Sequence, residues 1–327
     1  MTVGKTGEGA EKQMAHSQSP FPSAVRISVI IPHLNQPDML ARCLASLKAG
    51  KRAADAIIVV DNGSTALPEA ICAAHPGVQL LQEPTPGPGP ARNRGVTAAT
   101  GDILAFIDAD CIAAPDWLAQ AEAAMADPAA TILGGDVRIA YANPDRLTML
   151  EAYESVYAYR MDRYIAREGF TGTGNLVVRR AVLADVGAFA GIDVAEDRDW
   201  GHRATAKGYR IRYVAGMRVY HPARTDFAGL RQKWRRQSSH DYTEGKVRLN
   251  WRARWIVKML AMGISPVAGI PRILLSDRVS GARSRLLAFA CLVRIRFYRA
   301  RIMIWLSLGG DPAKLAEQWN RVPGSKS

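Results

Sequence analysis

Cysteine is scarce in this chain, with four residues in 327, and the four are too scattered for a disulfide framework or a thiolate metal site. We therefore expect reduced thiols of a cytosolic protein at Cys43, Cys72, Cys111 and Cys291. An apolar segment is also lacking in residues 1–24, which are polar and rich in Gly, Ser, Glu and Lys. We expect neither a signal peptide nor a membrane anchor there, but a disordered tail.

The phosphate-binding loop of ATP-hydrolysing enzymes is absent as well. Residues 81–90 carry four prolines, which predicts a stiff loop, and the helical pattern of residues 91–100 follows without a Gly-Lys-Ser/Thr sequence. A loop that enters a helix N-terminus leaves backbone amides unpaired, and Arg92 and Arg94 add positive charge. We therefore expect this segment to bind an anion, with ATP-type chemistry disfavoured.

Three apolar, β-branched runs predict buried strands at residues 26–32, 55–60 and 103–110. Helical patterns such as residues 39–47 alternate with them, as in a parallel sheet covered on both faces. Polar residues lie at or just beyond the ends of these runs: Asn35, Asp61, Asp108 and Asp110. Ligands bind outside the carboxyl ends of strands in such a sheet, so we expect these side chains at a site, although the sequence at Asp61 also fits a plain turn.

Asp108 and Asp110 form the most informative pair. They are two residues apart, so in an extended chain their side chains point the same way. Two carboxylates at a strand end suit a hard divalent cation that also binds phosphate oxygens. An Asp-x-Asp sequence also occurs in turns and helix caps, so the pair alone leaves both interpretations open.

Six short segments carry a resemblance to a known family. They are residues 28–35 (SVIIPHLN), 59–65 (VVDNGST), 89–95 (GPARNRG), 101–110 (GDILAFIDAD), 173–178 (TGNLVV) and 196–200 (EDRDW). In order and rough spacing they resemble the family 2 inverting glycosyltransferases of the GT-A fold. The resemblance implies a catalytic α/β domain over residues 25–223, with a mixed, mainly parallel sheet and flanking helices.

The same resemblance implies which residues bind a nucleotide-diphosphate sugar donor: Pro32, Asn35, Asp61, Arg92, Asn93, Asp108, Ala109 and Asp110. It assigns Gly174 and Asn175 to a loop beside the transferred sugar or the acceptor, although Thr173-Gly-Asn departs modestly from the usual family pattern. The implied cofactor is Mg²⁺ or Mn²⁺, held by Asp108 and Asp110. A histidine near the position of His221 can complete that metal shell in GT-A enzymes, and imidazole suits Mn²⁺ better than Mg²⁺.

Inverting sugar transfer needs a base that deprotonates the acceptor hydroxyl, and a carboxylate is the usual choice. The family pattern assigns this role to Asp197, beside Glu196, and either Glu196 or Asp199 could take it instead. The same three acids would also favour the N-terminus of a helix running to Lys207, a role that does not exclude catalysis.

The last segment, residues 224–327, differs in character. Residues 224–301 hold eighteen lysines and arginines but four acids, so they account for the +13 charge of the chain. The apolar runs are interrupted, at 255–271 by Lys258, Pro266 and Pro271 and at 286–308 by four arginines, so neither is a convincing membrane span. We expect basic amphipathic helices that lie on an anionic membrane surface or dip into it, on the cytosolic face of the inner membrane.

Several alternatives stay open for this segment and for the function. The basic region could bind nucleic acid, which its long apolar runs disfavour, or pack as a helical bundle against the catalytic domain or a second subunit. Residues 230–237 hold Gln, Trp and Arg in another order than the Gln-x-x-Arg-Trp signature of processive family members, which favours transfer of one sugar to a lipid-linked or glycan acceptor. A non-catalytic nucleotide-sugar scaffold and a sugar nucleotidyltransferase are the rival functions.

Overall fold

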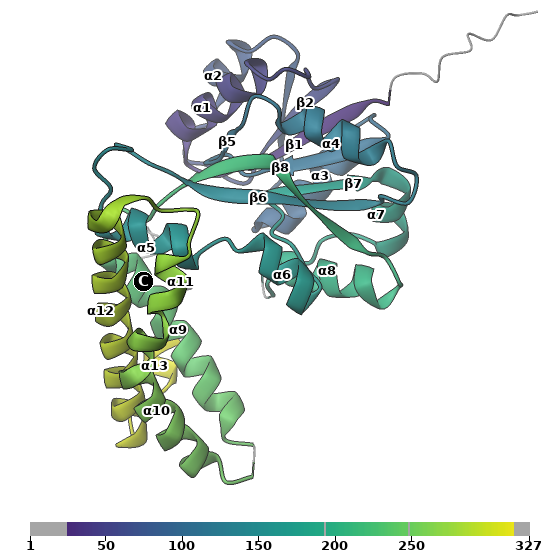
Figure 1. Cartoon of the computed structure of the whole chain (residues 1–327). Helices are drawn as coiled ribbons and strands as arrows, with labels where there is room; N and C mark the ends of the chain where they lie inside the picture. The colour runs from purple at the N-terminus through teal and green to yellow at the C-terminus, as the bar shows by residue number, and fades with distance from the viewer. Residues whose placement is uncertain (1–24, 193, 248, 317–327) are drawn as a thin grey trace, which may run out of the picture.

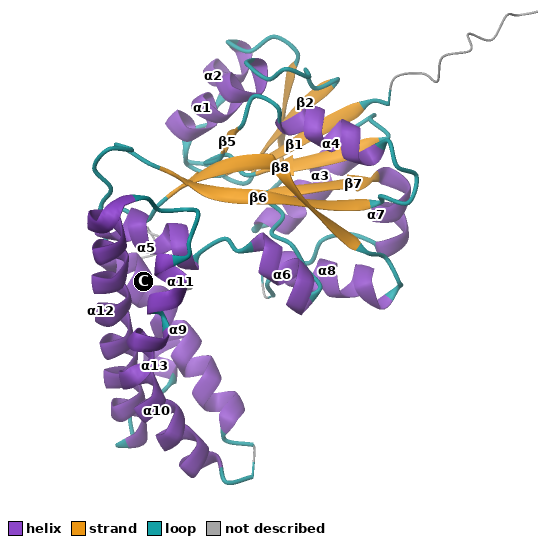
Figure 2. Cartoon of the chain, in the orientation of Figure 1, coloured by secondary structure: helices purple, strands orange, loops and turns teal. Residues whose placement is uncertain are grey.

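A computed structural model of the protein describes residues 25–192, 194–247 and 249–316; the predicted tail lies outside them. An eight-stranded mixed sheet forms the centre, in the order β3-β2-β1-β4-β7-β6-β8-β5 (Figures 1 and 2). Parallel pairing joins β3, β2, β1 and β4, and also β6 and β8, while β7 runs antiparallel to both its neighbours. The strands are β1 (Ile27–His33), β2 (Ala56–Asp61), β3 (Val78–Gln82), β4 (Ile103–Ile107), β5 (Ile112–Ala113), β6 (Ile132–Ala140), β7 (Asn175–Arg179) and β8 (Ile211–Pro222).

Helices cover both faces of the sheet. The alternation of side chains along β1 sends Val29 and Ile31 to one face and Ile30 to the other. The first face packs on α1 and α4, and the second on α3, α7 and α8. The helices of this part are α1 (Pro37–Lys48), α2 (Glu69–Ala73), α3 (Pro88–Ala98), α4 (Trp117–Met125), α5 (Met149–Tyr157), α6 (Met161–Glu168), α7 (Arg180–Val186) and α8 (Glu196–Ala206). The fold class expected from the sequence is confirmed.

The third predicted strand is wrong at its end. β4 stops at Ile107, and the amide of Cys111 donates to the carbonyl oxygen of Asp108 at 3.0 Å, which closes a turn. Asp108 and Asp110 therefore lie in a turn rather than in extended chain. The two-residue spacing no longer sends their side chains the same way, and each finds its own partners.

The C-terminal helices form a long bundle that extends away from the sheet (Figure 1). They are α9 (Phe227–Gly245), α10 (Trp251–Ala268), α11 (Ile270–Leu274), α12 (Gly281–Ser307) and α13 (Ala313–Ala316). The four arginines that interrupt the second apolar run do not interrupt α12, which continues through them and buries an i, i+3, i+4 stripe from Ala288 to Leu306. Arg299 is buried, with its guanidinium 3.9 Å from the ring centre of Trp234, so part of the positive charge faces the bundle interior rather than a membrane.

The bundle is continuous with the α/β domain. Leu292 and Ile295 of α12 pack with Tyr153 and Val156 of α5, in one apolar cluster. In the turn after α11, Arg278 donates to the buried carboxylate of Asp136 on β6 and to the carbonyl oxygen of Val137 at 2.9 Å. Removal of the bundle would therefore uncover a core face of the domain.

Candidate functional site

The tips of β1 and β2 are locked together. His33 Nδ1 and Asp61 Oδ1 lie 2.9 Å apart, with both side chains buried, and the backbone amides of Gly63 and Ser64 donate to Asp61 Oδ2. Burial alone would raise the pKa of Asp61, but the hydrogen bonds from Ser64 and His33 outweigh it and lower that pKa. Asn35, with a positive φ of 54°, accepts from the amide and hydroxyl of Thr65. Asp61 and Asn35 thus shape the loop at the strand tips, and both carboxylate oxygens of Asp61 already have partners.

Arg92 on α3 is buried and holds two carboxylates at once. One amino group of its guanidinium donates to Asp108 Oδ1 at 2.6 Å, and the other donates to Glu196 Oε1 at 2.9 Å. The expected contact with a phosphate stays a prediction for Arg92. Its charge is already neutralised by the turn after β4 and by the first residue of α8, and it fixes these two segments relative to each other.

The structure offers few backbone amides for the predicted anion site at the N-terminus of α3, which stays a prediction. Gly87 is the N-cap, and Pro88 and Pro90 stand among the first three helical residues. Proline carries no N–H, so most of the amides on which the expectation rested do not exist. A Cβ at Gly89 would lie 1.9 Å from the carbonyl oxygen of Ala190, so protein backbone, rather than open space, faces this turn.

Asp110 and His221 come together from opposite parts of the sheet. His221 Nε2 lies 3.3 Å from Asp110 Oδ2, and His221 Nδ1 lies 2.7 Å from the carbonyl oxygen of Pro222. A carbonyl only accepts, so Nδ1 carries a hydrogen; in a neutral ring Nε2 then presents its lone pair to Asp110, and in a charged ring it donates to Asp110. Tyr159, which has no motif around it and was missed in the sequence, places its hydroxyl 3.2 Å from the imidazole. Its positive φ of 48° is the feature that sets it apart.

The expected three-residue metal site is only partly assembled. No group of three or more His, Cys, Asp and Glu side chains suited to a metal ion is found within the described residues, and Asp108 is held by Arg92 instead. Asp110 and His221 remain as a pair, one offering a carboxylate oxygen and the other a ring nitrogen. When the imidazole is neutral, two lone pairs face each other at 3.3 Å and repel unless a cation lies between them, whereas a protonated ring forms an ion pair with Asp110. Burial raises the pKa of Asp110, His221 opposes this and Asp108 adds to it. The pair fits a divalent cation whose other ligands come from elsewhere.

Three acids begin α8, and their surroundings differ. Glu196 pairs with Arg92, and Asp199 pairs with Arg203 at 2.9 Å one turn along the helix. Asp197 accepts from the amide of Arg198 at 2.7 Å, and no ion pair to it is found among the described residues. Burial, followed by the charge of Glu196, raises the pKa of Asp197. A carboxylate with a raised proton affinity and no cation beside it is the one suited to accept a proton.

Two amide side chains expected at the donor or acceptor make hydrogen bonds inside the protein. Asn175 is fully buried, accepts from Trp117 Nε1 at 2.8 Å, and donates to the carbonyl oxygens of Asp136 and Met217. Asn93 exchanges two hydrogen bonds with the backbone of Phe189. The amide of Asn175 is thus engaged inside the protein, and Asn93 is half-buried with one donated and one accepted bond; their expected contacts with a ligand stay predictions.

Gly174 matters because it has no side chain. A Cβ at this position would lie 2.4 Å from Asp108 Oδ2, so only glycine lets the loop before β7 approach that carboxylate. Pro32 and Ala109 line the same edge through their backbone: Pro32 pairs with Val60 in the sheet, and Ala109 is buried within the turn between the two aspartates. The turn, α8 and this loop thus converge at one end of the sheet.

Comparison with known proteins agrees with this architecture. Residues 28–187 match the model of the family described as Glycosyl transferase family 2. The chain is 30% identical to glycosyltransferase AglE of Haloferax volcanii over 217 residues, which cover 64% of this chain and 71% of that protein. It is 29% identical to the pre-mycofactocin glycosyltransferase of Mycobacterium tuberculosis over 65% of this chain, and spans less than half, 46%, of that relative.

A solved structure extends the likeness in shape. The mannosyltransferase PcManGT from Pyrobaculum calidifontis, determined in complex with GDP-Man and Mn²⁺, superposes with a TM-score of 0.54 over 94% of this chain and 91% of its own, at 18% identity. At this identity the likeness supports the fold. Together with the matched family model and the identity to AglE, it establishes that the chain belongs to glycosyl transferase family 2 and is a glycosyltransferase of GT-A fold.

Proposed function

We propose that the chain transfers one sugar from a nucleotide-diphosphate sugar to a hydroxyl of a lipid-linked acceptor, with inversion at the anomeric carbon. The observation that carries this proposal is the bridge formed by Arg92, which ties Asp108 to Glu196 and so fixes the N-terminus of α8 against the turn after β4. Asp197 follows Glu196 directly and has the raised pKa of a base. The bridge thus supports the proposal by keeping Asp197 and the turn after β4, where we propose that the donor binds, at one edge of the sheet.

We assign a divalent cation to Asp110 and His221, which would hold it with carboxylate and imidazole ligands. Such a cation would neutralise the charge that develops on the leaving diphosphate. The Nδ1 bond to Pro222 orients the imidazole so that Nε2 is available, an arrangement that often supports metal-ligating histidines. Tyr159 packs on the ring at a centroid distance of 4.6 Å and limits its rotation.

We further propose that the protein works on the cytosolic face of the inner membrane. By length and composition alone, one stretch of the described residues, Trp251–Leu274, could cross a membrane, and 17% of its most apolar window is buried. Its inner side packs in the bundle through Trp255, Met262 and Ile273. Its outer side exposes a stripe with i, i+3, i+4 spacing, which we call the α10–α11 stripe: Val257, Leu260, Ile264, Val267 and Leu274, each 57–72% exposed.

A stripe with one free side favours a helix that lies in the membrane surface over one that spans it. Arg252, Arg254 and Lys258 stand at its N-terminal end, where they can meet anionic headgroups. Because one side of α10 packs against α12 and only the other side is exposed, we propose a monotopic attachment.

The proposal is tested by incubating the purified protein with a panel of nucleotide sugars, with Mn²⁺ or Mg²⁺ or with chelator, and with lipid-linked acceptors. We expect release of the nucleoside diphosphate with one donor, dependent on metal, and a product of opposite anomeric configuration by NMR. A product of retained configuration would reject inversion, and metal-independent turnover would reject the cation.

A further inference from the structure

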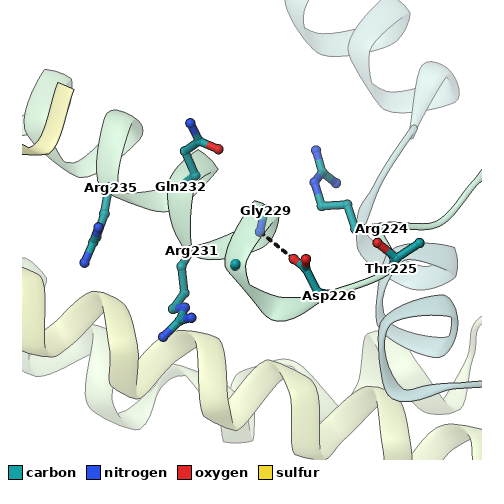
Figure 3. A pocket seen from close by; sticks show the side chains of 8 residues that line it. Arg224, Thr225, Asp226, Gly229, Arg231, Gln232 and Arg235 are labelled. Atoms are coloured by element: carbon teal, nitrogen blue, oxygen red, sulfur yellow. Dashed lines mark hydrogen bonds between the residues drawn. The ribbon is translucent and has the colours of Figure 1, made fainter. Parts of the chain in front are cut away.

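A groove follows α9 from the end of β8 to α12 and α13. Two adjoining hollows, of about 720 and 500 Å³, make it up, and both are lined by Arg231 and Arg235. These residues lie four apart, and Figure 3 shows both side chains on the same side of α9, toward the neighbouring helix. The shared lining makes the two hollows one continuous feature.

The lining of the groove is strongly cationic. Five cationic side chains and one carboxylate border it: Arg224, Arg231, Arg235, Arg301 and Lys314, with Asp226. The carboxylate of Asp226 already accepts from the amide of Gly229 at 2.9 Å, as the N-cap of α9 (Figure 3). The lining stays net positive after the pairing of Arg224 with Glu154 is included, and this net charge attracts an anion with several oxygens, such as a phosphate or diphosphate.

The cations are partly held in place before any ligand arrives. Arg235 Nε donates to the hydroxyl of Tyr298 on α12 at 2.8 Å, and the guanidinium of Arg231 lies 5.9 Å from the ring centre of Phe227. Arg224 pairs with the buried Glu154 of α5. Ordered side chains of this kind lose less freedom on binding than free ones.

The far end of the groove adds apolar side chains to its cationic lining. Ile302 and Trp305 of α12 line it, and Trp305 is 40% exposed. Ile304 and Leu308 continue this exposed surface, Leu308 with 82% of its area in solvent. A ligand that fits both ends therefore has a phosphate head and a hydrocarbon tail.

The near end adjoins the transfer site. Arg224 follows His221 by three residues, and its partner Glu154 belongs to α5, whose last turn leads to Tyr159. Tyr159 in turn contacts His221, the partner of Asp110. The near end of the groove is thus connected to the proposed metal pair through Tyr159, which both Arg224 and Asp110 influence electrostatically.

We propose that this groove binds the phosphate or diphosphate of an amphiphilic acceptor, with its hydrocarbon chain leaving past Trp305. The inference rests on the proposed function, because only that function makes the bound lipid an acceptor. Its chemistry, a lipid phosphate, is shared with phospholipid headgroups, so the two sources must be separated by experiment.

The test measures binding to the full chain without nucleotide sugar or metal, by calorimetry. The probes are farnesyl diphosphate below its micelle concentration, inorganic pyrophosphate, farnesol, and vesicles of phosphatidylglycerol. We expect farnesyl diphosphate to bind more tightly than either pyrophosphate or farnesol. The double variant Arg231→Gln/Arg301→Gln should weaken that binding about tenfold or more, because charge-assisted hydrogen bonds are lost. The matched control is Arg210→Gln, an exposed arginine before β8 and remote in sequence from the groove.

Each outcome decides the proposal, once circular dichroism shows that the variants fold. Equal affinity for pyrophosphate, or for farnesol, would overturn an amphiphile site, and unchanged farnesyl diphosphate binding in the double variant would overturn the groove. If the variant instead lost vesicle binding and kept farnesyl diphosphate, the site would be one for bilayer headgroups. Absence of sugar transfer with every donor, while farnesyl diphosphate still binds through Arg231 and Arg301, would reject the proposed function and leave the lipid phosphate site standing.

Discussion

Arg92 joins two parts of the chain that lie 104 residues apart, the helix that carries it and the first residue of α8. A buried arginine is costly unless it is paired, and here two carboxylates neutralise it. The arrangement leaves the neighbouring Asp197 and Asp110 without an arginine partner among the ion pairs of the described residues. The two carboxylates to which we assign the roles of base and metal ligand are therefore those without an arginine partner among these ion pairs.

Replacing Asp110 by alanine tests the metal pair. We expect Asp110→Ala to abolish turnover and to remove the metal-dependent part of donor affinity, because His221 alone is a poor site for a hard cation. Titration calorimetry with the donor, with and without Mn²⁺, measures this. Asp116→Ala is the control, since Asp116 makes no capping hydrogen bond at the start of α4. Metal-dependent affinity that stays at the wild-type value would remove Asp110 from the cation site.

Replacing Asp197 by asparagine tests the base. Asp197→Asn should lower kcat by roughly 10²–10⁴-fold and leave donor affinity in place, because the group acts in the transition state. Asp199→Asn, whose wild-type carboxylate is paired with Arg203, should stay within a few-fold of wild type. The opposite ranking of the two variants would move the role of base to Asp199.

The raised pKa of Asp197 adds a pH dependence. The base must be ionised to work, so kcat/KM should rise with pH through the pKa of Asp197 and level off above it. Burial and Glu196 raise that pKa, so the acidic limb should lie above the ordinary range of aspartate. A profile of kcat/KM against pH checks this, and Glu196→Gln should shift the limb toward lower pH because one negative neighbour is removed. An acidic limb at or below the ordinary aspartate range would contradict the assignment.

At the scale of elements, the sheet follows from local pattern and the site does not. Apolar runs predicted β1, β2 and most of β4, because strand burial is written into consecutive residues. Asn175 and Asn93 could not be judged in the same way. Their partners lie 39 to 96 residues away, so the sequence around each amide does not show which internal hydrogen bonds it makes. Pro88 and Pro90 did carry a local signal, since their missing amides already argued against an anion site on α3.

Substitution of Arg278 tests how the helical bundle is joined to β6. Its guanidinium reaches Asp136 at the irregularity of β6, where Arg138 also pairs with that carboxylate at 2.7 Å. Arg278→Met would leave a buried carboxylate with fewer partners, and we expect the free energy of unfolding to fall by about 3 kcal/mol. Urea unfolding followed by circular dichroism measures it, with the exposed Arg210→Met as control. A loss below about 1 kcal/mol, close to that of a surface substitution, would contradict a structural role for the pair.

For the whole molecule, charge and apolar surface meet on the bundle, and this determines how membrane attachment can be tested. Truncation before α10 is unsuitable, because α12 covers Tyr153 and Val156 of α5 and its loss would expose a core face. The sequence predicted the basic, apolar character of this region. It could not tell that α12 turns Arg299 inward or that α10 leaves one apolar side free, because both depend on how the helices pack.

Substitutions within the α10–α11 stripe therefore test attachment. The wild-type chain should co-sediment with phosphatidylglycerol vesicles and only weakly with phosphatidylcholine, and added salt should release it in part, because screening weakens the charge attraction and leaves apolar insertion. Leu260→Glu/Ile264→Glu should remove the salt-resistant fraction, since two charges would enter the apolar layer. Leu67→Glu/Ile192→Glu, at exposed apolar positions of the α/β domain, should bind as wild type does. Equal sedimentation with neutral vesicles and no response to salt would indicate integral insertion, whereas no binding to either vesicle would make the stripe a packing or oligomer surface.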